Sequence, residues 1–265
     1  MVEEMVINVD NVTVGYGERI VLCDVSMRVM RGQVHVLVGG SGCGKSTLLK
    51  NIIGLAQPMA GIITVLGEET SSINNESAHL LSQRIGILFQ GGALLGSLDI
   101  YDNVALPLRE HTNLTEELIS DVVGSMLAVV GLHDAHRMLP EELSGGMRKR
   151  AALARAMVMG PELLICDEPS AGLDPITAAG IDQLIINLRD RFGMTVLIIT
   201  HELSSIEAIA DTITMLHSGN IIFDGTPKQV QASTIPEVRA FFDRIPAQQT
   251  HTNSIFAEIM RGKAS

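Results

Sequence analysis

A glycine-rich loop between a strand pattern and a helix pattern constrains the fold of this chain more than any other segment. The segment reads GQVHVLVGGSGCGKSTLLKNIIGL: residues 34–38 alternate as in a strand, and a run of good helix formers follows the glycines. It fits G-x-x-x-x-G-K-[ST], a loop whose backbone N–H groups surround phosphate oxygens at the start of a helix. The fitting residues are Gly39, Gly44, Lys45 and Ser46.

The order strand, loop, helix favours a phosphate site over a glycine-rich turn without a ligand. The bare pattern arises by chance in on the order of one chain in a hundred of this length. With its flanking elements, it predicts that Lys45 reaches the outer phosphates as a point charge and that Ser46 ligates Mg²⁺.

The composition limits the class of protein. A chain of 265 residues with 46% hydrophobic side chains can bury the core of one large domain or of a domain with an inserted lobe. Its net charge of -11 argues against broad binding to nucleic acid or anionic lipid, so a phosphate site has to be local. We therefore expect no nucleic-acid partner.

Targeting and membrane signals are weak. The N-terminal stretch MVEEMVINVDN lacks the basic and apolar regions of a secretion signal. Apolar runs are interrupted, as at Gln57 and Pro58, well short of the roughly 18 residues that a membrane span needs. Cys23, Cys43 and Cys166 are odd in number and have no metal-ligand spacing, which suits reduced thiols in a cytosol.

A second informative run, PELLICDEPSAGLDP, covers residues 161–175. Its four apolar residues predict a short buried strand that delivers Asp167 and Glu168 to the sheet edge where α/β proteins bind ligands. This is a Walker B-like element, in which Asp167 would hold Mg²⁺ and Glu168 would polarise the attacking water. The alternative is a pair of solvated carboxylates that cap a helix beginning near Pro169.

Two further strands end in polar residues. MTVLIIT (194–200) leads directly into His201, and RIGILFQ (84–90) ends with Gln90, whose amide could sense the metal or the attacking water. A histidine at a strand end is more often structural than catalytic, and a lone glutamine after a strand means little. His201 would lie at the same sheet edge as Asp167.

The stretch LSGGMRKRAALARAM (143–157) places three cations in the first turns of a predicted helix. A helix begins with unpaired N–H groups and a partial positive charge, so cations there are mildly unfavourable and an anion is favoured. The pattern indicates that a negative group belongs nearby.

Taken in order, these segments resemble the ATP-binding cassette (ABC) ATPases. The matching elements are GGSGCGKST, Gln90, LSGG, LLICDE, AGLD and His201, within residues 5–225. The resemblance implies an α/β fold: a P-loop NTPase with a RecA-like core, an antiparallel β subdomain and an inserted helical subdomain. It implies ATP and Mg²⁺ as cofactors, with Ser46, Gln90 and Asp167 at the metal and Glu168, His201 and Gln90 as catalytic residues.

The resemblance also assigns the nucleotide contacts. Tyr16, in the stretch GYGE, is similar to the aromatic residue that stacks on adenine, although an exposed loop tyrosine is the alternative. The remaining expected ATP contacts are Gly39, Gly40, Ser41, Gly42, Cys43, Gly44, Lys45, Ser46 and Thr47.

The LSGG turn is similar to a half-site that contacts the nucleotide of a second copy. Ser144, Gly145 and Gly146 would meet the γ-phosphate held by the partner in a head-to-tail homodimer. The three cations that follow, at positions 148–150, are expected on the solvated face of the helix. Asp174 matches a loop that communicates between the two copies, although its neighbour Pro175 makes a simple turn equally plausible. Met147 departs from the glutamine common in the family.

Within the family, residues 91–115 and LSGGMRKRAALARA look like the Mla-type ATPases of phospholipid traffic between bacterial membranes, which are associated with mammalian-cell-entry (MCE) proteins. The likeness implies a membrane permease, an MCE-domain lipid-binding protein, a small STAS-like regulatory subunit and a place on the cytoplasmic face of the inner membrane. The alternatives are an importer of amino acids or metals and a soluble ABC ATPase that does not transport.

The expected organisation is a cassette over residues 1–225, with its helical insert at about 91–155, and an extension over 226–265. In the extension, IPEVRAFF predicts a short helix, and Ile255, Phe256, Ile259 and Met260 share one helical face. That face would pack on this chain's own core or on the second ATPase subunit.

Overall fold

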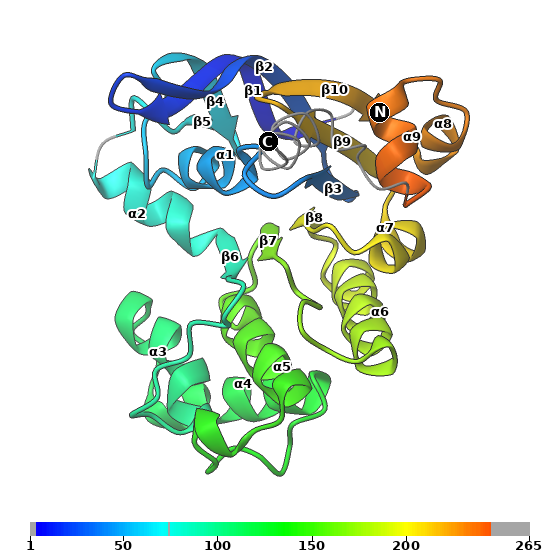
Figure 1. Cartoon of the computed structure of the whole chain (residues 1–265). Helices are drawn as coiled ribbons and strands as arrows, with labels where there is room; N and C mark the ends of the chain where they lie inside the picture. Colours follow the sequence, from blue (N-terminus) through cyan, green and yellow to red (C-terminus); the bar gives the residue numbers. More distant parts are fainter. Residues whose placement is uncertain (1–3, 74, 245–265) are drawn as a thin grey trace, which may run out of the picture.

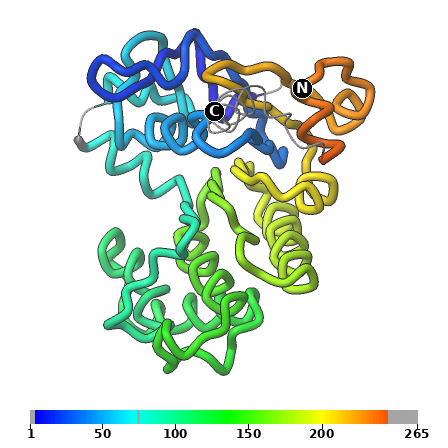
Figure 2. The backbone as a smooth tube through the Cα atoms, viewed as in Figure 1, coloured from blue at the N-terminus to red at the C-terminus, as the bar shows by residue number. Residues whose placement is uncertain are grey.

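The computed structural model describes residues 4–73 and 75–244. Their helices and strands form three regions that can be followed in Figures 1 and 2: a sheet of N-terminal strands at the top, a second sheet that runs from β10 beside it down to β6, and a group of helices at the bottom. The expected α/β class, with an antiparallel β lobe and a helical lobe beside the core, is confirmed.

The upper sheet is antiparallel and has the order β2-β1-β4-β5. Its strands are β1 (Met5–Tyr16), β2 (Arg19–Met30), β4 (Ala60–Val65) and β5 (Glu68–Glu69). β1 and β2 are joined by a tight turn in which Gly17 has a φ of 56°, a conformation that glycine adopts without steric cost. Their apolar side chains face inward, which leaves the outer face polar.

The second sheet has the order β10-β9-β3-β8-β7-β6, and only the edge strand β10 runs antiparallel to its neighbour within this sheet. Its strands are β3 (Val34–Gly39), β6 (Ile85–Leu88), β7 (Leu163–Asp167), β8 (Thr195–Ile199), β9 (Thr212–His217) and β10 (Asn220–Gly225). Alternate residues of β7 enter different cores: Leu163 and Ile165 pack towards the antiparallel lobe, Leu164 and Cys166 towards the other face. Burial on both faces explains the continuous apolar runs in the sequence.

Helices cover this sheet and form the lower lobe (Figure 1). The longer ones are α1 (Lys45–Ile52), α2 (Asn75–Gln83), α3 (Ile100–His111), α4 (Glu116–Val129), α5 (Gly145–Met157) and α6 (Pro175–Phe192). The shorter ones are the 3₁₀ helix η1 (Pro140–Glu142), α7 (Leu203–Ile209), α8 (Pro227–Gln231) and α9 (Pro236–Phe242). The expected short helix at IPEVRAFF is α9, whereas the face at residues 255–260 lies outside the described residues.

The lower lobe lies between β6 and β7 along the chain. α3 packs on α4 and α5, and α5 also packs against β6, so α5 joins the lobe to the sheet. Asp99 caps α3 by accepting the N–H of Asp102, and Thr115 caps α4 in the same way. No helix in residues 4–73 and 75–244 has both the length and the apolar character needed to cross a bilayer.

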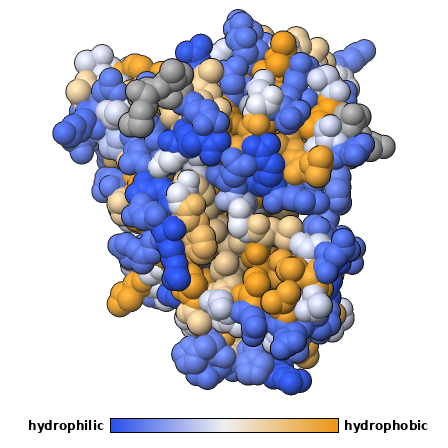
Figure 3. Space-filling view, turned by 180° about the vertical axis from the view of Figure 1, so that it is seen from behind, coloured by the Kyte–Doolittle hydropathy of each residue, from blue (hydrophilic) through white to orange (hydrophobic). Residues whose placement is uncertain are grey.

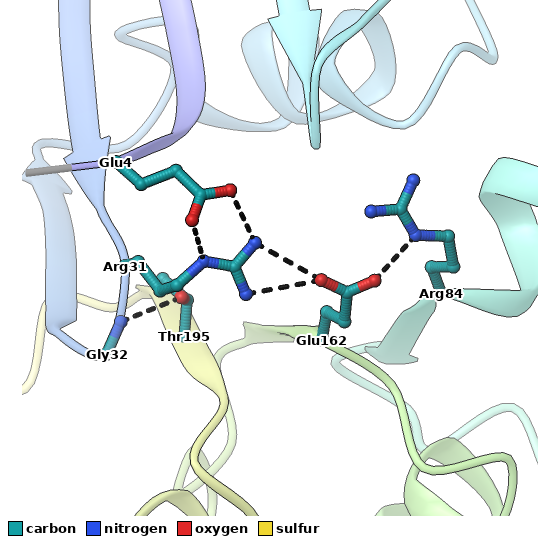
Figure 4. Close-up of polar contacts among 6 residues, drawn as sticks. All are labelled: Glu4, Arg31, Gly32, Arg84, Glu162 and Thr195. Atoms are coloured by element: carbon teal, nitrogen blue, oxygen red, sulfur yellow. Dashed lines mark hydrogen bonds and ion pairs between the residues drawn. The ribbon is translucent and has the colours of Figure 1, made fainter. Parts of the chain in front are cut away.

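An ion network ties the two sheets together at the amino ends of the parallel strands (Figure 4). Arg31, between β2 and β3, is paired with Glu4 and Glu162, and Glu162 also accepts a hydrogen bond from Arg84 just before β6. Beside it, the N–H of Gly32 donates to the hydroxyl of Thr195 at the start of β8. The network lies at the strand ends opposite those that carry the expected phosphate site.

Candidate active site

The loop of residues 39–44 joins β3 to α1 and needs glycine at both ends. Gly39 has a φ of 153°, and a Cβ on it would overlap the carbonyl oxygen of Leu216 and the sulfur of Cys43. Gly44 has a φ of 109°, and a Cβ there would overlap the side chain of Leu22. Only glycine fits these positions, so the loop stays close to β9 and β2 and α1 begins at Lys45.

The amine of Lys45 lies within this loop. It donates hydrogen bonds to the carbonyl oxygens of Gly39, at 2.8 Å, and Gly40, at 3.0 Å. Its Nζ is 3.9 Å from the sulfur of Cys43. A mobile cation is thus placed among the N–H groups of the loop and the start of α1, which is the arrangement that binds phosphates.

β7 carries the two carboxylates to the neighbouring part of the sheet edge. Asp167 is the last residue of β7, and Glu168 follows in the left-handed region with a φ of 51°. Burial raises the pKa of Asp167, and the nearby charge of Glu168 raises it further, whereas Lys45 and Lys149 lower it. A bound cation would offset this unfavourable burial of negative charge.

The carboxylate of Glu168 is held by residues that follow β8. Its Oε1 is 2.6 Å from Nδ1 of His201, and its Oε2 accepts a hydrogen bond of 3.3 Å from the hydroxyl of Thr200. The side chain is only 10% exposed, so its orientation is well defined. The alternative of two solvated carboxylates capping a helix at Pro169 is therefore wrong, and the next helix, α6, begins only at Pro175.

The predicted groups meet in one cavity of about 570 Å³. Its lining residues are Gly39, Gly40, Ser41, Gly42, Lys45, Ser46, Gln90, Asp167, Glu168, His201 and Phe241. Phe241 was not predicted, because α9 is far from the motifs along the chain and no pattern marks its place at the cavity. Thr200 was not predicted either, although its position directly before His201 was an available signal.

The oxygen atoms around this cavity suit Mg²⁺. Ser46 offers a hydroxyl, Gln90 an amide and Asp167 a carboxylate, which are hard ligands. Within the described residues, no group of three or more His, Cys, Asp or Glu side chains could hold a metal alone. The set fits a cation shared between a few protein oxygens and phosphates, as is usual for Mg²⁺.

Tyr16 lies beside a neighbouring cavity of about 350 Å³. Tyr16 is the last residue of β1 and does not lie in the turn between β1 and β2. It is 55% exposed, and its hydroxyl is 3.4 Å from that of Thr47. The other lining residues are Arg19, Val21, Gly42, Gly44, Lys45, Ser46 and Thr47. Because the two cavities share loop residues, a nucleotide with its phosphates on the loop has room for its base near Tyr16.

The LSGG turn lies apart from both cavities and lines neither of them. Ser144 caps α5, and its Oγ accepts the N–H of Met147 at 3.2 Å. Ser144 and Gly145 are exposed, whereas Gly146 is buried, and a Cβ on it would overlap Thr177. Ser144 and Gly145 are therefore accessible at the start of α5, where Gly145 lines a separate cavity of about 220 Å³ together with Gln90 and Lys149.

The three cations after the LSGG turn do not share one environment. Arg148 is exposed as expected, but Lys149 is only 7% exposed, and Arg150 donates to the carbonyl oxygen of Val130. The expectation that all three lie on the solvated face is wrong for Lys149, because its long side chain turns inward to two carbonyl oxygens, those of Gln90 and Glu168.

Asp174 is the N-cap of α6. Its carboxylate accepts the N–H groups of Ile176 and Thr177. Hydrogen bonds from Thr177 lower the pKa of Asp174, so it stays ionised beside the positive end of α6. Asp174 is thus a helix cap rather than part of the simple turn that Pro175 suggested, and its role between two copies stays a prediction.

The sequence profile of the ABC transporter family matches residues 22–171, which is more than half of the chain. The chain belongs to the ABC transporter family. It is thus an ABC ATPase, and ATP is its nucleotide. The matched range contains the phosphate loop, the LSGG turn and the carboxylates of β7, but ends before His201 and Phe241.

Curated relatives match most of the chain. A Mycobacterium tuberculosis protein called "Probable ribonucleotide transport ATP-binding protein mkl" is 40% identical over 237 residues, which are 89% of this chain and 66% of that protein. The Escherichia coli "Intermembrane phospholipid transport system ATP-binding protein MlaF" is 39% identical over 86% of this chain and 85% of its own length.

Solved structures share the fold. CbiO1 of Clostridium perfringens, described as part of the ABC transporter complex cbiONQ, has a TM-score of 0.80 and 29% identity, and the match covers 98% of this chain and all of that one. The ATP-binding cassette MJ0796, a dimer bound to ADP and Pi, has a TM-score of 0.75 and 28% identity over 83% of this chain and 98% of its own.

Proposed function

We propose that this chain is the ATP-hydrolysing subunit of a bacterial ABC transporter that moves phospholipids between the inner and the outer membrane. The observation that carries the hydrolytic part is the cavity that joins the phosphate loop to buried Glu168 and to His201, the more exposed residue that is hydrogen-bonded to it. The phospholipid part is supported by the identity to MlaF along most of both chains. The mycobacterial relative is named for a different substrate, so the cargo has to be tested.

The proposed roles follow from the geometry. The loop of residues 39–47 binds the phosphates, Lys45 neutralises the outer ones and Tyr16 stacks on the base. Ser46, Gln90 and Asp167 would hold Mg²⁺, which supplies positive charge at the phosphates when it is bound. Glu168 orients the attacking water and accepts its proton, and His201 fixes the carboxylate through their hydrogen bond.

The exposed start of α5 supports a head-to-tail dimer. The hydroxyl of Ser144 and the N–H groups of Gly145 and Gly146 would bind the γ-phosphate on the partner, since none of these residues lines the cavity at the chain's own phosphate loop. Dimeric structures of the cassette MJ0796 are consistent with this assembly. Moving such a switch from mostly open to mostly closed requires a differential affinity of roughly 5 kcal/mol.

The remaining partners would be a membrane permease, an MCE-domain lipid-binding protein and a STAS-like regulatory subunit, with this chain on the cytoplasmic face of the inner membrane. Apolar surface gathers over the lower half of the face in Figure 3, the half that the helical lobe forms in Figure 1. Exposed apolar residues of that lobe include Leu95, Leu114 and Leu118. Such a surface suits a protein partner. We assign the cassette to residues 1–225, its helical insert to about 91–155 and an extension to 226–265.

Purification of the complex with its native membrane partners tests the proposal. We expect phospholipid and a permease to co-purify, and phospholipid to stimulate ATP hydrolysis by the complex. A complex that carries no phospholipid and responds to ribonucleotides, amino acids or metal ions instead would refute the lipid assignment while leaving the ATPase assignment intact.

A further inference from the structure

Lys149 is a buried cation that the proposed chemistry does not use. It lies on the first turns of α5 and is 7% exposed. Its amine donates one hydrogen bond to the backbone carbonyl oxygen of Gln90, at 2.5 Å, and one to that of Glu168, at 2.9 Å. A single side chain therefore joins the segment after β6 to the turn after β7.

The carbonyl group of Glu168 belongs to a residue with an unusual backbone. Its φ of 51° is rare outside glycine and persists only when the surroundings fix it. The N–H of Glu168 donates to the carbonyl oxygen of Ile199 at 2.8 Å, and its own carbonyl group is held by Lys149. These two hydrogen bonds hold Glu168 in its left-handed backbone conformation, in which its carboxylate reaches His201.

The segment of residues 90–93 is held by the same helix at a second point. Arg155, further along α5, donates to the carbonyl oxygens of Gly92, at 2.9 Å, and Ala93, at 2.7 Å. Within the described residues, the hydrogen bonds of the Arg155 guanidinium go to this one segment, whereas those of Lys149 go to two segments. Because of this difference, replacing Lys149 and replacing Arg155 should have different effects, which an experiment can compare.

The start of α5 lies close to Lys149. Ser144 precedes Lys149 by five positions, which is about 7.5 Å along a helix. A displacement of the LSGG turn by a phosphate is therefore shared by Lys149, since an α-helix of this length moves as one body.

We propose that Lys149 is a positioning residue that couples the two nucleotide sites of the dimer. The start of α5 contacts the nucleotide of the partner, while Lys149 on the same helix aligns Gln90 and Glu168 at the chain's own nucleotide. Occupancy of one site thus reaches the catalytic residues of the other through a single helix. This inference rests on the head-to-tail assembly proposed above.

The test compares Lys149→Met, Lys149→Arg, Arg155→Met and Arg148→Met in the full complex. For Lys149→Met we expect unchanged ATP affinity of the isolated chain, a kcat lower by on the order of a hundredfold, and a Hill coefficient for ATP near 1. Lys149→Arg should restore part of kcat and part of the cooperativity, because it keeps a hydrogen-bond donor at the same place. Arg155→Met should lower kcat without removing cooperativity, and exposed Arg148→Met should behave as wild type.

Ser144→Arg in the same assay distinguishes a failure of the proposed two-chain site from a failure of the proposed role of Lys149. If it leaves turnover intact, the two-chain site is wrong and the coupling fails with it. If it abolishes turnover while Lys149→Met keeps wild-type kcat and cooperativity, only the role of Lys149 is refuted. A Lys149→Met variant whose loss of turnover merely follows its loss of folded protein, measured by thermal unfolding, also refutes it.

Discussion

Glu168 combines a left-handed backbone with a carboxylate that is held from two sides. The hydrogen bonds to His201 and Thr200 fix both oxygens, and burial keeps competing water away. A residue placed at such cost at the edge of a parallel sheet, next to a phosphate loop, is positioned for chemistry rather than for folding.

Replacing Glu168 with Gln should therefore separate binding from hydrolysis. The amide keeps the size and one acceptor but cannot take a proton from water, so turnover should fall by on the order of a hundredfold or more. The affinity for ATP, measured by equilibrium binding, should stay close to wild type. Turnover near the wild-type rate would place the general base on another residue.

Among single residues, those that lie in motifs could be predicted from the sequence. Those that reach the site only through the packing of other elements could not. Lys45, Asp167 and His201 each follow a recognisable strand or loop, so their meeting in one cavity was predictable. The burial of Lys149 was not, because helix periodicity alone places it beside exposed Arg148. Phe241 reaches the cavity only through the packing of α9, which no local pattern encodes.

Between elements, the contact of β3 with β9 contains a buried histidine. Both ring nitrogens of His35 are within hydrogen-bond distance of hydroxyl groups, those of Thr212 at 2.8 Å and Thr214 at 2.9 Å. Burial lowers the pKa of His35 from 6.5 to about 4. The strand that leads into the phosphate loop thus depends on a neutral imidazole.

This pKa makes stability depend on pH. The unfolded chain binds a proton at His35 below pH 6.5 and the folded chain only below about pH 4, so stability falls as the pH drops between these values. The loss reaches about 3 kcal/mol. His35→Gln should remove this part of the slope in urea unfolding followed by circular dichroism, which suits a chain without tryptophan.

Exposed His133 is the matched control for that experiment. His133→Gln should retain the wild-type dependence of the unfolding free energy on pH, since its side chain is largely in solvent. An unaltered slope in His35→Gln would show that the imidazole between β3 and β9 is not the group responsible.

The ion network at the opposite strand ends should contribute to stability without affecting turnover (Figure 4). Hydrogen bonds from Arg84 and Arg31 lower the pKa of Glu162, so this contribution is present above pH 4.5 and is lost as the pH falls through the lower, folded value. Because these side chains are about a third exposed, Glu162→Gln should lower the unfolding free energy by only about 1 kcal/mol. ATP turnover of Glu162→Gln at 25 °C should equal that of the wild type. A large loss of turnover would show that the network also affects the active site.

The order of the elements was largely predictable, and their layering was less so. Alternating valines predicted a strand at 34–38, and continuous apolar runs predicted strands at 163–166 and within 194–200; the structure has them at Val34–Gly39, Leu163–Asp167 and Thr195–Ile199. The alternation of their side chains between two cores depends on tertiary packing. The start of α6 at Pro175 was also missed, because the turn of residues 168–173 uses the left-handed backbone of Glu168, which a sequence pattern does not reveal.

In the whole molecule, the proposed head-to-tail assembly would give each chain two unlike halves of a reaction site. The phosphate loop and Glu168 line one cavity, and the LSGG turn lies outside that cavity at the start of α5. On this proposal, a single chain is incomplete for hydrolysis unless a second copy supplies the missing donors. Such an arrangement can be tested by complementation between two inactive variants.

Ser144→Arg and Glu168→Gln should each be inactive as homodimers but active when mixed. In the mixed dimer, the intact Glu168 of one chain faces the intact Ser144 of the other, which leaves one complete site, so random mixing should recover on the order of a quarter of wild-type turnover. Thr115→Arg is the control, because it removes the equivalent cap of α4 without touching the LSGG turn. If each chain completed its own site, every mixed dimer would carry one defect per site and no activity would return; recovery therefore requires that the serine and the glutamate of one working site belong to different chains.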